Sequence, residues 1–523
     1  MSYKPLIGDG TAGESEPACQ LRVEKPALKI LLYTDNPTGI QDGEAMFDLG
    51  VMLKHLRAHA PAFATVDTEW VSRYSEKTGD ADKKLDGLLT QSTVPYDEVW
   101  FFGLHQENVP KYSSGVGGGG PESELEKKEI DALRNWMQGG VEKGMRGGGV
   151  LMTGDHNHPR PEDALPGNQS PPCPDSSTCE EFFGLGRALG RCVPRAGRLR
   201  KWEGQPTNRK EDSVNTQVPN LGADIESSLL QLDSAAQQLL LETFDETGKP
   251  TQGGLPHPLF FYKSGSRILF FPDHAHEGVI SLPDKSEFAN LDEWPKCKDI
   301  QPRPQVVAHG IDSRNCKVHA LVAAYDGDLA GVGRIVADST WHHYVNVNLT
   351  SFPHPSASGS PGDQIGQFYG NLAIWLAPRE QRYQMACAMF WWLANHPLMV
   401  EEIGGHVLNI GSTAYFILSK ISSPCEIHEL LQAAVPAAYS EQFESFYFPE
   451  AVLALSQFPS KSLILGCVLD GYHKEMIRFK NSDGTGKRVG IDEVIAAGFK
   501  RAFKEHAAAI GEIQSKAEKL ATL

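Results

Sequence analysis

Acidic and histidine side chains recur in three short windows of this sequence, and each window directly follows an apolar run. The members are Asp155, His156 and His158 in the first window, Asp273, His274, His276 and Glu277 in the second, and Asp338, His342 and His343 in the third. Imidazole nitrogens and carboxylate oxygens bind divalent transition metals, and they are also the side-chain groups that carry protons near neutral pH. The windows are therefore candidates for a shared chemical site.

Such a collection of groups is compatible with two kinds of chemistry. A divalent metal held with one open position makes its bound water a nucleophile near neutral pH. Without a metal, one histidine oriented by an acid would act as general base and another as acid. The number of histidines favours the metal, which would be zinc, iron or manganese. The spacing matches no strict motif such as His-Glu-x-x-His, and such residues at strand ends also serve as helix caps and loop hydrogen-bond partners.

The elements around the windows predict an α/β fold. Apolar and β-branched runs predict strands at 27–35, 63–73, 96–103, 147–155, 304–310, 319–327 and 333–340, a hairpin at 258–273, and amphipathic helices at 44–59 and 122–140. Strands that alternate with helices form a doubly wound, mostly parallel sheet. Because the carboxyl ends of parallel strands lie at one edge of such a sheet, we expect the three windows to converge there.

Composition changes along the chain predict its division into parts. Residues 1–25 are polar and aperiodic, which predicts a flexible tail. An α/β domain is expected over 26–350, with a long polar insertion at about 157–225. After a loop at 351–363, apolar residues at helical spacing predict a mainly helical C-terminal region over 364–523. This region would cover the sheet or mediate contact with another copy or a partner protein.

The overall composition excludes several classes of protein. Among 523 residues the formal net charge is −17, which disfavours binding to nucleic acid or to an anionic membrane surface. No apolar run reaches the roughly 20 residues that a membrane helix needs. The first residues do not resemble a secretory signal, so we expect a cytoplasmic protein. Nine scattered cysteines without a Cys-x-x-Cys pair indicate neither a disulfide framework nor a zinc finger.

Four segments together resemble the class I glutamine amidotransferase-like superfamily, and within it the trehalose-utilisation (ThuA-like) branch. They are "KILLYTD", "YDEVWFFG", "GGGVLMTGDH" and "GVGRIVADSTWHH", and the resemblance covers about residues 27–349. It implies a flavodoxin-like fold with a pocket at the strand ends. A fold alone does not determine the activity.

The sequence departs from that superfamily at the nucleophile. The superfamily carries Gly-x-Cys-x-Gly at the elbow, whereas this chain has Thr153, Gly154, Asp155 and His156 there. The superfamily's His-x-Glu is echoed by His274, His276 and Glu277, but without the thiol these residues cannot perform cysteine-dependent amide hydrolysis. Glutaminase activity is therefore not expected.

These observations lead to a first functional hypothesis and an alternative. The first is a metal-dependent hydrolase of a small polar substrate, with Asp155, Glu277 and Asp338 as the catalytic acids. The metal ligands would come from the six histidines at 156, 158, 274, 276, 342 and 343, and the leading set is Asp155, His156, His274 and His342. Glu277 or Asp338 would act as general base or orient a histidine. The alternative is an inactive scaffold that binds a ligand or a partner protein.

Overall fold

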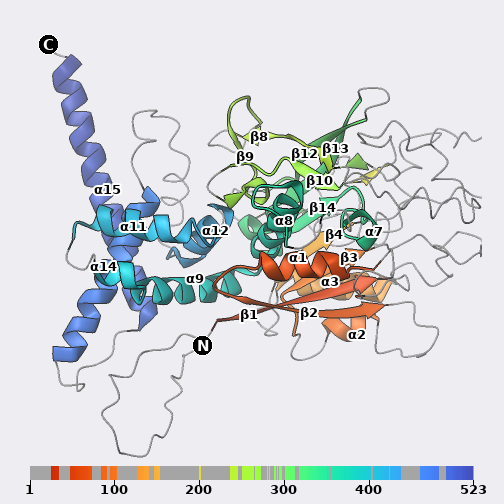
Figure 1. Cartoon of the computed structure of the whole chain (residues 1–523), viewed down its shortest axis with the longest axis horizontal. Coiled ribbons are helices and arrows are strands. Elements are labelled where there is room, and N and C mark those ends of the chain that lie inside the picture. The colour runs from red at the N-terminus through yellow and green to blue at the C-terminus, as the bar shows by residue number, and fades with distance from the viewer. Residues whose placement is uncertain are drawn as a thin grey trace, which may run out of the picture.

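The computed structural model describes residues 25–34, 40, 48–72, 84–90, 95–102, 127–139, 147–153, 200–201, 236–244, 250–263, 266–272, 279–280, 282, 288–289, 291, 294–296, 301–312, 317–349, 352, 355–401, 405–422, 424–436, 460–481 and 490–521. They form one large sheet, three two-stranded ribbons and a set of helices (Figure 1). The expected tail at 1–25 lies outside the described residues except for Lys25. The expected insertion at 157–225 also lies outside them, apart from residues 200–201.

The large sheet has eight strands in the order β2-β1-β3-β4-β14-β13-β12-β7. Their bounds are β1 Ala27–Thr34, β2 Thr65–Ser72, β3 Glu98–Phe102, β4 Gly149–Met152, β7 Leu240–Leu241, β12 Gln305–Asp312, β13 Lys317–Tyr325 and β14 Ile335–Asp338. Neighbouring strands from β2 through β14 pair in parallel, and those from β14 to β7 pair antiparallel. The expected α/β class and mostly parallel sheet are confirmed.

The central strands form where the sequence is apolar without interruption. Every residue of β3, β4 and β14 is buried, as expected for parallel strands that are covered on both faces. By contrast, β2 lies at the edge of the sheet, carries Asp67 and Glu69, and has only one buried residue. Charged residues on an edge strand discourage pairing with another chain.

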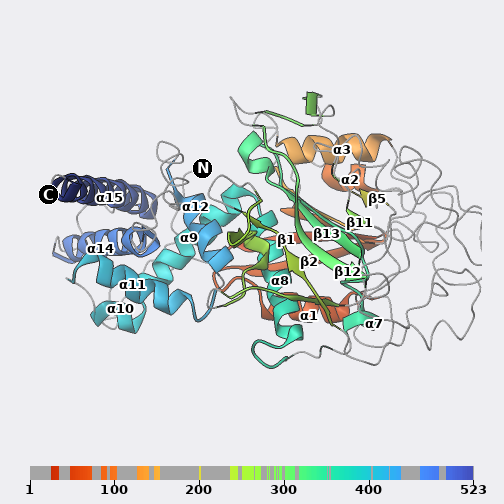
Figure 2. The same ribbon diagram turned by 90° about the horizontal axis from the view of Figure 1, so that it is seen from above.

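Helices cover both faces of the sheet, with α1 (Gly50–Ala58) and α8 (Pro361–Leu376) on one face and α2 (Leu85–Leu89) and α3 (Lys127–Gln138) on the other (Figure 2). Successive strand residues alternate between these two layers. Ile30, Leu32, Trp100 and Phe102 pack on the α1–α8 side, and Leu31, Tyr33, Val99 and Phe101 pack on the α2–α3 side. The core is therefore divided by the sheet into two apolar layers.

Two details of strand pairing go beyond the predictions. Within the mostly parallel sheet, β12 and β13 form an antiparallel pair. Only residues 313–316 separate them, and a parallel crossover needs a dozen or more residues. The hairpin expected at 258–273 is reduced to one antiparallel bridge between Phe261 and Arg267. Its second strand, β10 (Phe270–Pro272), pairs instead with β6 (Ala236–Gln238), outside the large sheet.

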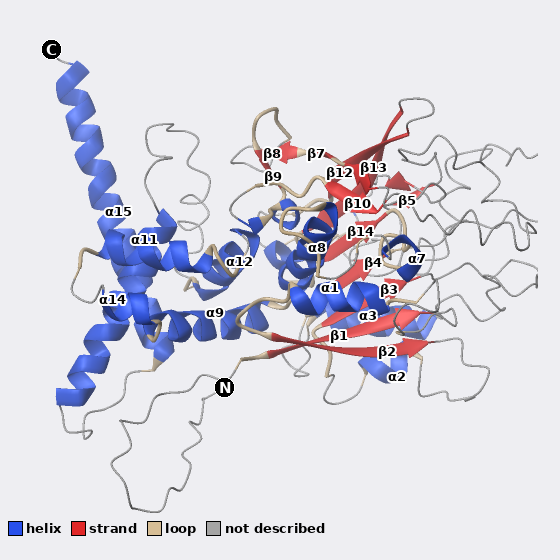
Figure 3. Ribbon diagram, in the orientation of Figure 1, coloured by secondary structure: helices blue, strands red, loops and turns tan. Residues whose placement is uncertain are grey.

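From residue 361 onward, every element in the described part of the chain is a helix (Figure 3). After α8 these are α9 Arg379–Ala394, α10 Pro397–Glu401, α11 Val407–Leu418, α12 Pro424–Ala434, α14 Ser460–Asn481 and α15 Ile491–Ala521. The strands β1, β2 and β3 point away from these helices, so the carboxyl edge of the sheet lies at the opposite side. None of the described helices is both long and apolar enough to cross a membrane.

The remaining elements are short. They are β5 Arg200–Lys201, β8 Thr243–Phe244, β9 Leu255–Pro256, β11 Val279–Ile280, the 3-10 helices Pro258–Phe260 and Gly327–Ala330, and α7 Asn346–Leu349. In α7 every residue is buried, and the backbone N–H of Asn346 donates to the carbonyl of Asp48 at 2.8 Å. The segment after β14 is thereby tied to the start of α1.

Candidate functional site

Asp338 is the centre of the one acid–histidine window that the structure describes. It is the last residue of β14 and is fully buried. His343 Nδ1 lies 2.9 Å from Asp338 Oδ1 and 3.0 Å from Oδ2. The Tyr344 hydroxyl donates to Oδ2 at 3.0 Å, and the Thr340 backbone N–H donates to Oδ1 at 3.3 Å. Each donor offsets part of the cost of burying the carboxylate.

The partners of the His343 ring determine which of its nitrogens carries the proton. An ionised Asp338 only accepts hydrogen bonds, so Nδ1 must be the donor. Nε2 lies 3.4 Å from the Nε2 of Gln237, whose amide donates to the Pro272 carbonyl at 3.2 Å. The amide nitrogen therefore also presents a hydrogen to the ring, and His343 Nε2 is the acceptor. His343 is therefore assigned the tautomer with its hydrogen on Nδ1 and its lone pair on Nε2.

Two tyrosines fix the same loop and remain protonated. Burial raises the pKa of both Tyr344 and Tyr369 well above the usual value, and the nearby charge of Asp338 raises each further. Tyr344 is therefore a permanent donor to Asp338. The Tyr369 hydroxyl, from α8, donates to the backbone carbonyl of His343 at 2.6 Å. The helix layer thus holds the His343 backbone while the strand end holds its side chain.

His342 points to different neighbours, although it adjoins His343 in the chain. Its ring packs edge-on against Trp341 at 4.9 Å between centroids. Its backbone N–H donates to the Thr340 hydroxyl at 2.9 Å, and its carbonyl accepts from the Asn348 amide at 2.9 Å. The structure thus brings Asp338 and His343 into direct contact and places His342 beside them in a buried turn.

The other predicted site residues lie outside the described residues. These are Asp155, His156 and His158 of the first window, and Asp273, His274, His276 and Glu277 of the second. The chain leading to each is described. Ala337 of β14 is in register with Met152 of β4, so Thr153, the residue after β4, and Asp338, the last residue of β14, follow paired residues of neighbouring parallel strands. Pro272, directly before the second window, reaches His343 through the Gln237 side chain.

The strand that precedes the second window is placed differently from the prediction. We expected Asp273 to follow a strand of the parallel sheet, but β10 lies in a separate ribbon with β6. The packing of Phe271 against the His343 ring, 5.0 Å between centroids, brings β10 to the end of β14. The aromatic contact and the Gln237 bridge replace the sheet pairing that the sequence had suggested.

A metal centre is not complete within the described ranges. There, no group of three or more His, Cys, Asp or Glu side chains is placed so that it could hold a metal ion. Both oxygens of Asp338 are already occupied by the His343 and Tyr344 donors. A metal would thus need ligands from the first and second windows, and it stays a prediction.

Known proteins offer no guide to this arrangement. No family model matches the chain, and no curated protein and no solved structure shows significant similarity to it. The function must therefore be argued from the geometry of the site.

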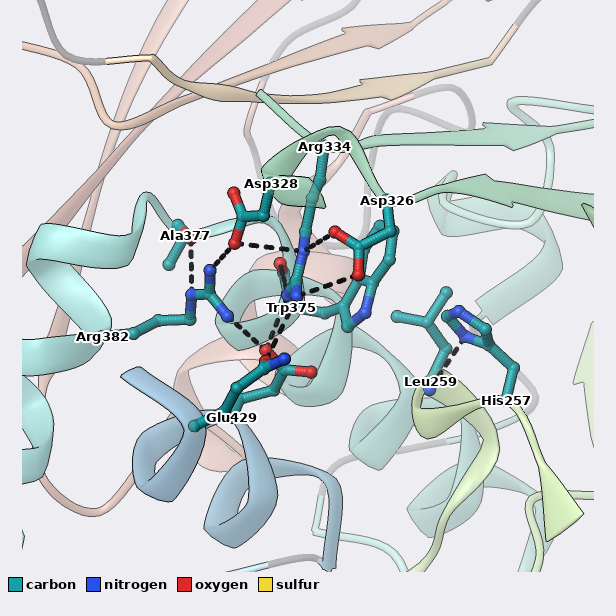
Figure 4. Close-up of polar contacts among 10 residues, drawn as sticks. His257, Leu259, Asp326, Asp328, Arg334, Trp375, Ala377, Arg382 and Glu429 are labelled. Carbon is teal, nitrogen blue, oxygen red and sulfur yellow. Dashed lines mark hydrogen bonds and ion pairs between the residues drawn. The ribbon is translucent and has the colours of Figure 1, made fainter. Parts of the chain in front are cut away.

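A second buried cluster of charged groups lies at the opposite end of β14 (Figure 4). Arg334, directly before β14, donates from Nε to Asp326 at 2.8 Å and from Nη1 to Glu429 at 2.6 Å. Arg382 donates to Glu429 and to Asp328. Glu429 belongs to α12 and Arg382 to α9, so the cluster joins the sheet to the C-terminal helices. Three carboxylates surround two guanidinium groups, which leaves no excess positive charge to bind an anion.

The charges in this second cluster are stable near neutral pH. Burial alone would raise the pKa of Glu429, but Arg334 and Arg382 outweigh it and lower the pKa to about 2. The Arg334 guanidinium also lies over the Trp375 ring, 4.7 Å from its centroid. Burial lowers the pKa of the neighbouring His257 to about 4, so that histidine is neutral. We interpret this cluster as a structural joint, not as a site of proton transfer.

Sequence patterns did not reveal several of the residues that build the site. Gln237, Tyr344 and Tyr369 were not predicted, because a glutamine or a tyrosine in an ordinary apolar context carries no spacing signal. The adjacency of Tyr344 to the third window was the only available hint. Gln237 lies 106 residues before His343 and is found only through the tertiary contact.

Proposed function

We propose that this protein is a hydrolase of a small polar substrate, with Asp338 and His343 as its proton-transferring pair. The observation that carries the proposal is the contact of both Asp338 oxygens with His343 Nδ1, at 2.9 and 3.0 Å. A carboxylate in this position fixes the tautomer and stabilises the imidazolium that forms when Nε2 exchanges the Gln237 N–H for a proton from the substrate or water. Asp338 therefore takes the orienting role that was one of its two predicted roles.

The proposal includes a divalent metal ion, either zinc, iron or manganese. Its ligands would be Asp155, His156, His274 and His342, and Glu277 would assist as an acid or a base. Two observations support this: Thr153 directly follows β4, the parallel neighbour of β14, and Pro272, the residue before the second window, accepts a hydrogen bond from the Gln237 amide. When bound, such an ion lowers the pKa of a coordinated water and so supplies a nucleophile.

The strand order supports the more specific fold proposal. The order β2-β1-β3-β4, followed by β14 as the fifth parallel strand, corresponds to the 2-1-3-4-5 order of flavodoxin-like sheets. In such sheets ligands bind outside the carboxyl ends of the strands, where Asp338 lies. We therefore propose a flavodoxin-like core that is related to the glutamine amidotransferase-like superfamily but does not use its cysteine.

A specific observation favours a second candidate function, an inactive scaffold. Asp338 and His343 are at most 2% exposed, and the carboxylate is fully hydrogen-bonded to its neighbours. A buried polar network of this kind also serves simply to specify one packing of the core. In that case the strand ends would bind a ligand or a partner protein without chemistry.

The two candidates are separated by metal analysis together with a hydrolysis assay. The purified protein is analysed for zinc, iron and manganese, and then assayed with p-nitrophenyl acetate and p-nitrophenyl phosphate. For a hydrolase we expect His343→Gln and Asp338→Asn to lower the rate by about 10²- to 10⁴-fold, the usual contribution of a general base. A control, His396→Gln, changes a partly exposed histidine between α9 and α10 and should leave the rate unchanged.

Circular dichroism of each variant shows whether it has folded. If the parent neither binds metal nor hydrolyses either ester, or if folded His343→Gln is as active as the parent, the hydrolase proposal is wrong. The scaffold candidate would then be the better account of the site.

A further inference from the structure

Gln237 connects the Asp338–His343 pair to the segment that leads into the second window. It lies in β6, and its side chain is 1% exposed. Its Nε2 donates to the Pro272 carbonyl at 3.2 Å and approaches His343 Nε2 at 3.4 Å. A single amide thus contacts both the imidazole and the residue directly before Asp273.

The Pro272 carbonyl decides how the Gln237 amide is oriented. If the amide were flipped, its oxygen would face the Pro272 carbonyl oxygen, and two acceptors would repel each other. The nitrogen must therefore point to Pro272 and His343, which leaves Oε1 on the other side. Among the described residues, Oε1 of Gln237 is buried and accepts no hydrogen bond. A buried acceptor in this situation is unfavourable unless a donor meets it.

We propose that Gln237 is a positioning residue of this site and that it selects the substrate class. Its N–H holds the Nε2 edge of His343, and its Oε1 accepts a hydrogen bond from a hydroxyl or amino group of the bound molecule. That the bound molecule is a substrate rests on the proposed function, whereas the binding of a hydrogen-bond donor at Gln237 does not. It assigns Gln237 a role that the residue pattern did not suggest.

The charges and acceptors around Gln237 define the chemistry of the group that fits. Oε1 of Gln237, Nε2 of His343 and the carbonyl of Pro272 are all acceptors, and the buried carboxylate of Asp338 lies behind the imidazole. Within the part of the chain that the structure describes, a phosphate or carboxylate group beside Oε1 would meet an acceptor and the like charge of Asp338, which is unfavourable at short range. A neutral or cationic group with N–H or O–H donors would satisfy the unpaired oxygen. The site is therefore selective for such donors over anions.

A purely structural role for Gln237 is the alternative, and Gln364 of α8 provides a matched control. Gln364 is also largely buried and also holds the segment before β10, because its Oε1 accepts from the Leu269 N–H at 2.8 Å. Its Nε2 donates to the Gly359 carbonyl at 3.0 Å, so both ends of its amide are used. Replacing either glutamine loosens the same segment, but only Gln237 contacts His343.

The test uses the full-length protein with ¹⁵N-labelled histidine, and it observes the ring signals of His343 by NMR. Glycerol is the probe for a neutral hydroxyl donor, and inorganic phosphate is the probe for an anion. In the parent we expect glycerol, but not phosphate, to shift the His343 signals in a saturable way. In Gln237→Met, which has similar length and no polar atom, we expect the glycerol affinity to fall at least tenfold. Gln364→Met should keep the parent affinity.

Each outcome decides the proposal. The proposal is overturned if Gln237→Met binds glycerol as tightly as the parent, or if Gln237→Met and Gln364→Met lose the same affinity. It is also overturned if the His343 signals of the parent do not respond to glycerol, or if they respond to phosphate. If Gln237→Met does not fold, Gln237→Asn replaces it, because the shorter amide stays polar but withdraws from His343, and the same loss is expected. A parent that binds glycerol but hydrolyses neither ester refutes the hydrolase and leaves the role of Gln237 intact.

Discussion

Replacing Glu429 by glutamine should destabilise the joint between the sheet and the C-terminal helices. Glu429 is 1% exposed and accepts from Arg334 at 2.6 Å and from Arg382. Glutamine keeps the size and one acceptor oxygen but removes the negative charge. Among the described residues, the two guanidinium groups then retain Asp326 and Asp328 as anionic partners. The substitution therefore isolates the contribution of one buried charge.

The magnitude follows from the pKa of Glu429. The native pKa is about 2, against the usual value of 4.5. At 1.36 kcal/mol per pKa unit, this gap corresponds to about 3 kcal/mol of stability at neutral pH. Removing one partner of a buried ion pair costs a similar amount, about 3–5 kcal/mol. Because Asp326 and Asp328 still balance the arginines, we expect a loss of about 3 kcal/mol for Glu429→Gln.

The pH dependence has a definite sign. A carboxyl group whose pKa is lowered on folding contributes its full stability above the unfolded pKa, and this contribution is lost as the pH falls towards the native pKa. The gap between the parent and Glu429→Gln should therefore be about 3 kcal/mol at pH 7 and fall to roughly half of that at pH 3. Salt should change it little, since buried pairs are weakly screened.

Urea denaturation followed by circular dichroism at pH 7 and pH 3 measures this difference, provided that the slope of the transition is unchanged. Glu505→Gln is the control, because Glu505 pairs with Arg501 at 2.7 Å on the surface of α15 and is 37% exposed. We expect that substitution to cost less than about 1 kcal/mol. The reasoning is refuted if the two variants lose the same stability, or if the loss in Glu429→Gln does not depend on pH.

Two further predictions concern buried groups elsewhere in the fold. Burial raises the pKa of Glu98 well above its usual value, so the folded state loses stability as the pH rises and this carboxyl group must ionise. Glu98→Gln carries no charge and keeps an acceptor for the Trp100 indole N–H. In a thermal scan this variant should melt at a higher temperature than the parent at pH 8 and at nearly the same temperature at pH 4. An equal gain at both pH values would contradict this. A Cβ added to Gly466 of α14 would lie 1.7 Å from the carbonyl oxygen of Val407 in α11. Gly466→Ala should therefore push the two helices apart and lower the free energy of unfolding, measured in urea, by about 1–3 kcal/mol. Gly511→Ala, which meets open space in α15, should instead stabilise by roughly 0.5–1 kcal/mol, and equal effects of the two would refute the close-packing argument.

Much of the α/β core could be predicted because its signals are local. The strands β1, β3, β4 and β14 are short apolar runs that end in turn residues, and each lies within the predicted range. The helix α3 follows from apolar residues at helical spacing. In these segments the spacing of apolar side chains and their burial in the fold indicate the same element, so the sequence alone is sufficient to predict it.

The sequence by itself determined the strands β1, β3, β4 and β14 and the helix α3, and it placed Asp338 at the end of a strand with His343 shortly after it. Only the tertiary structure decided the antiparallel direction of β13, the pairing of β10 with β6, and the bridge from Gln237 to His343. It also decided that Arg334 meets Glu429, 95 residues further along the chain. The physical reason is that hydrophobic periodicity is set by near neighbours, whereas partners for buried polar groups are set by where distant segments pack.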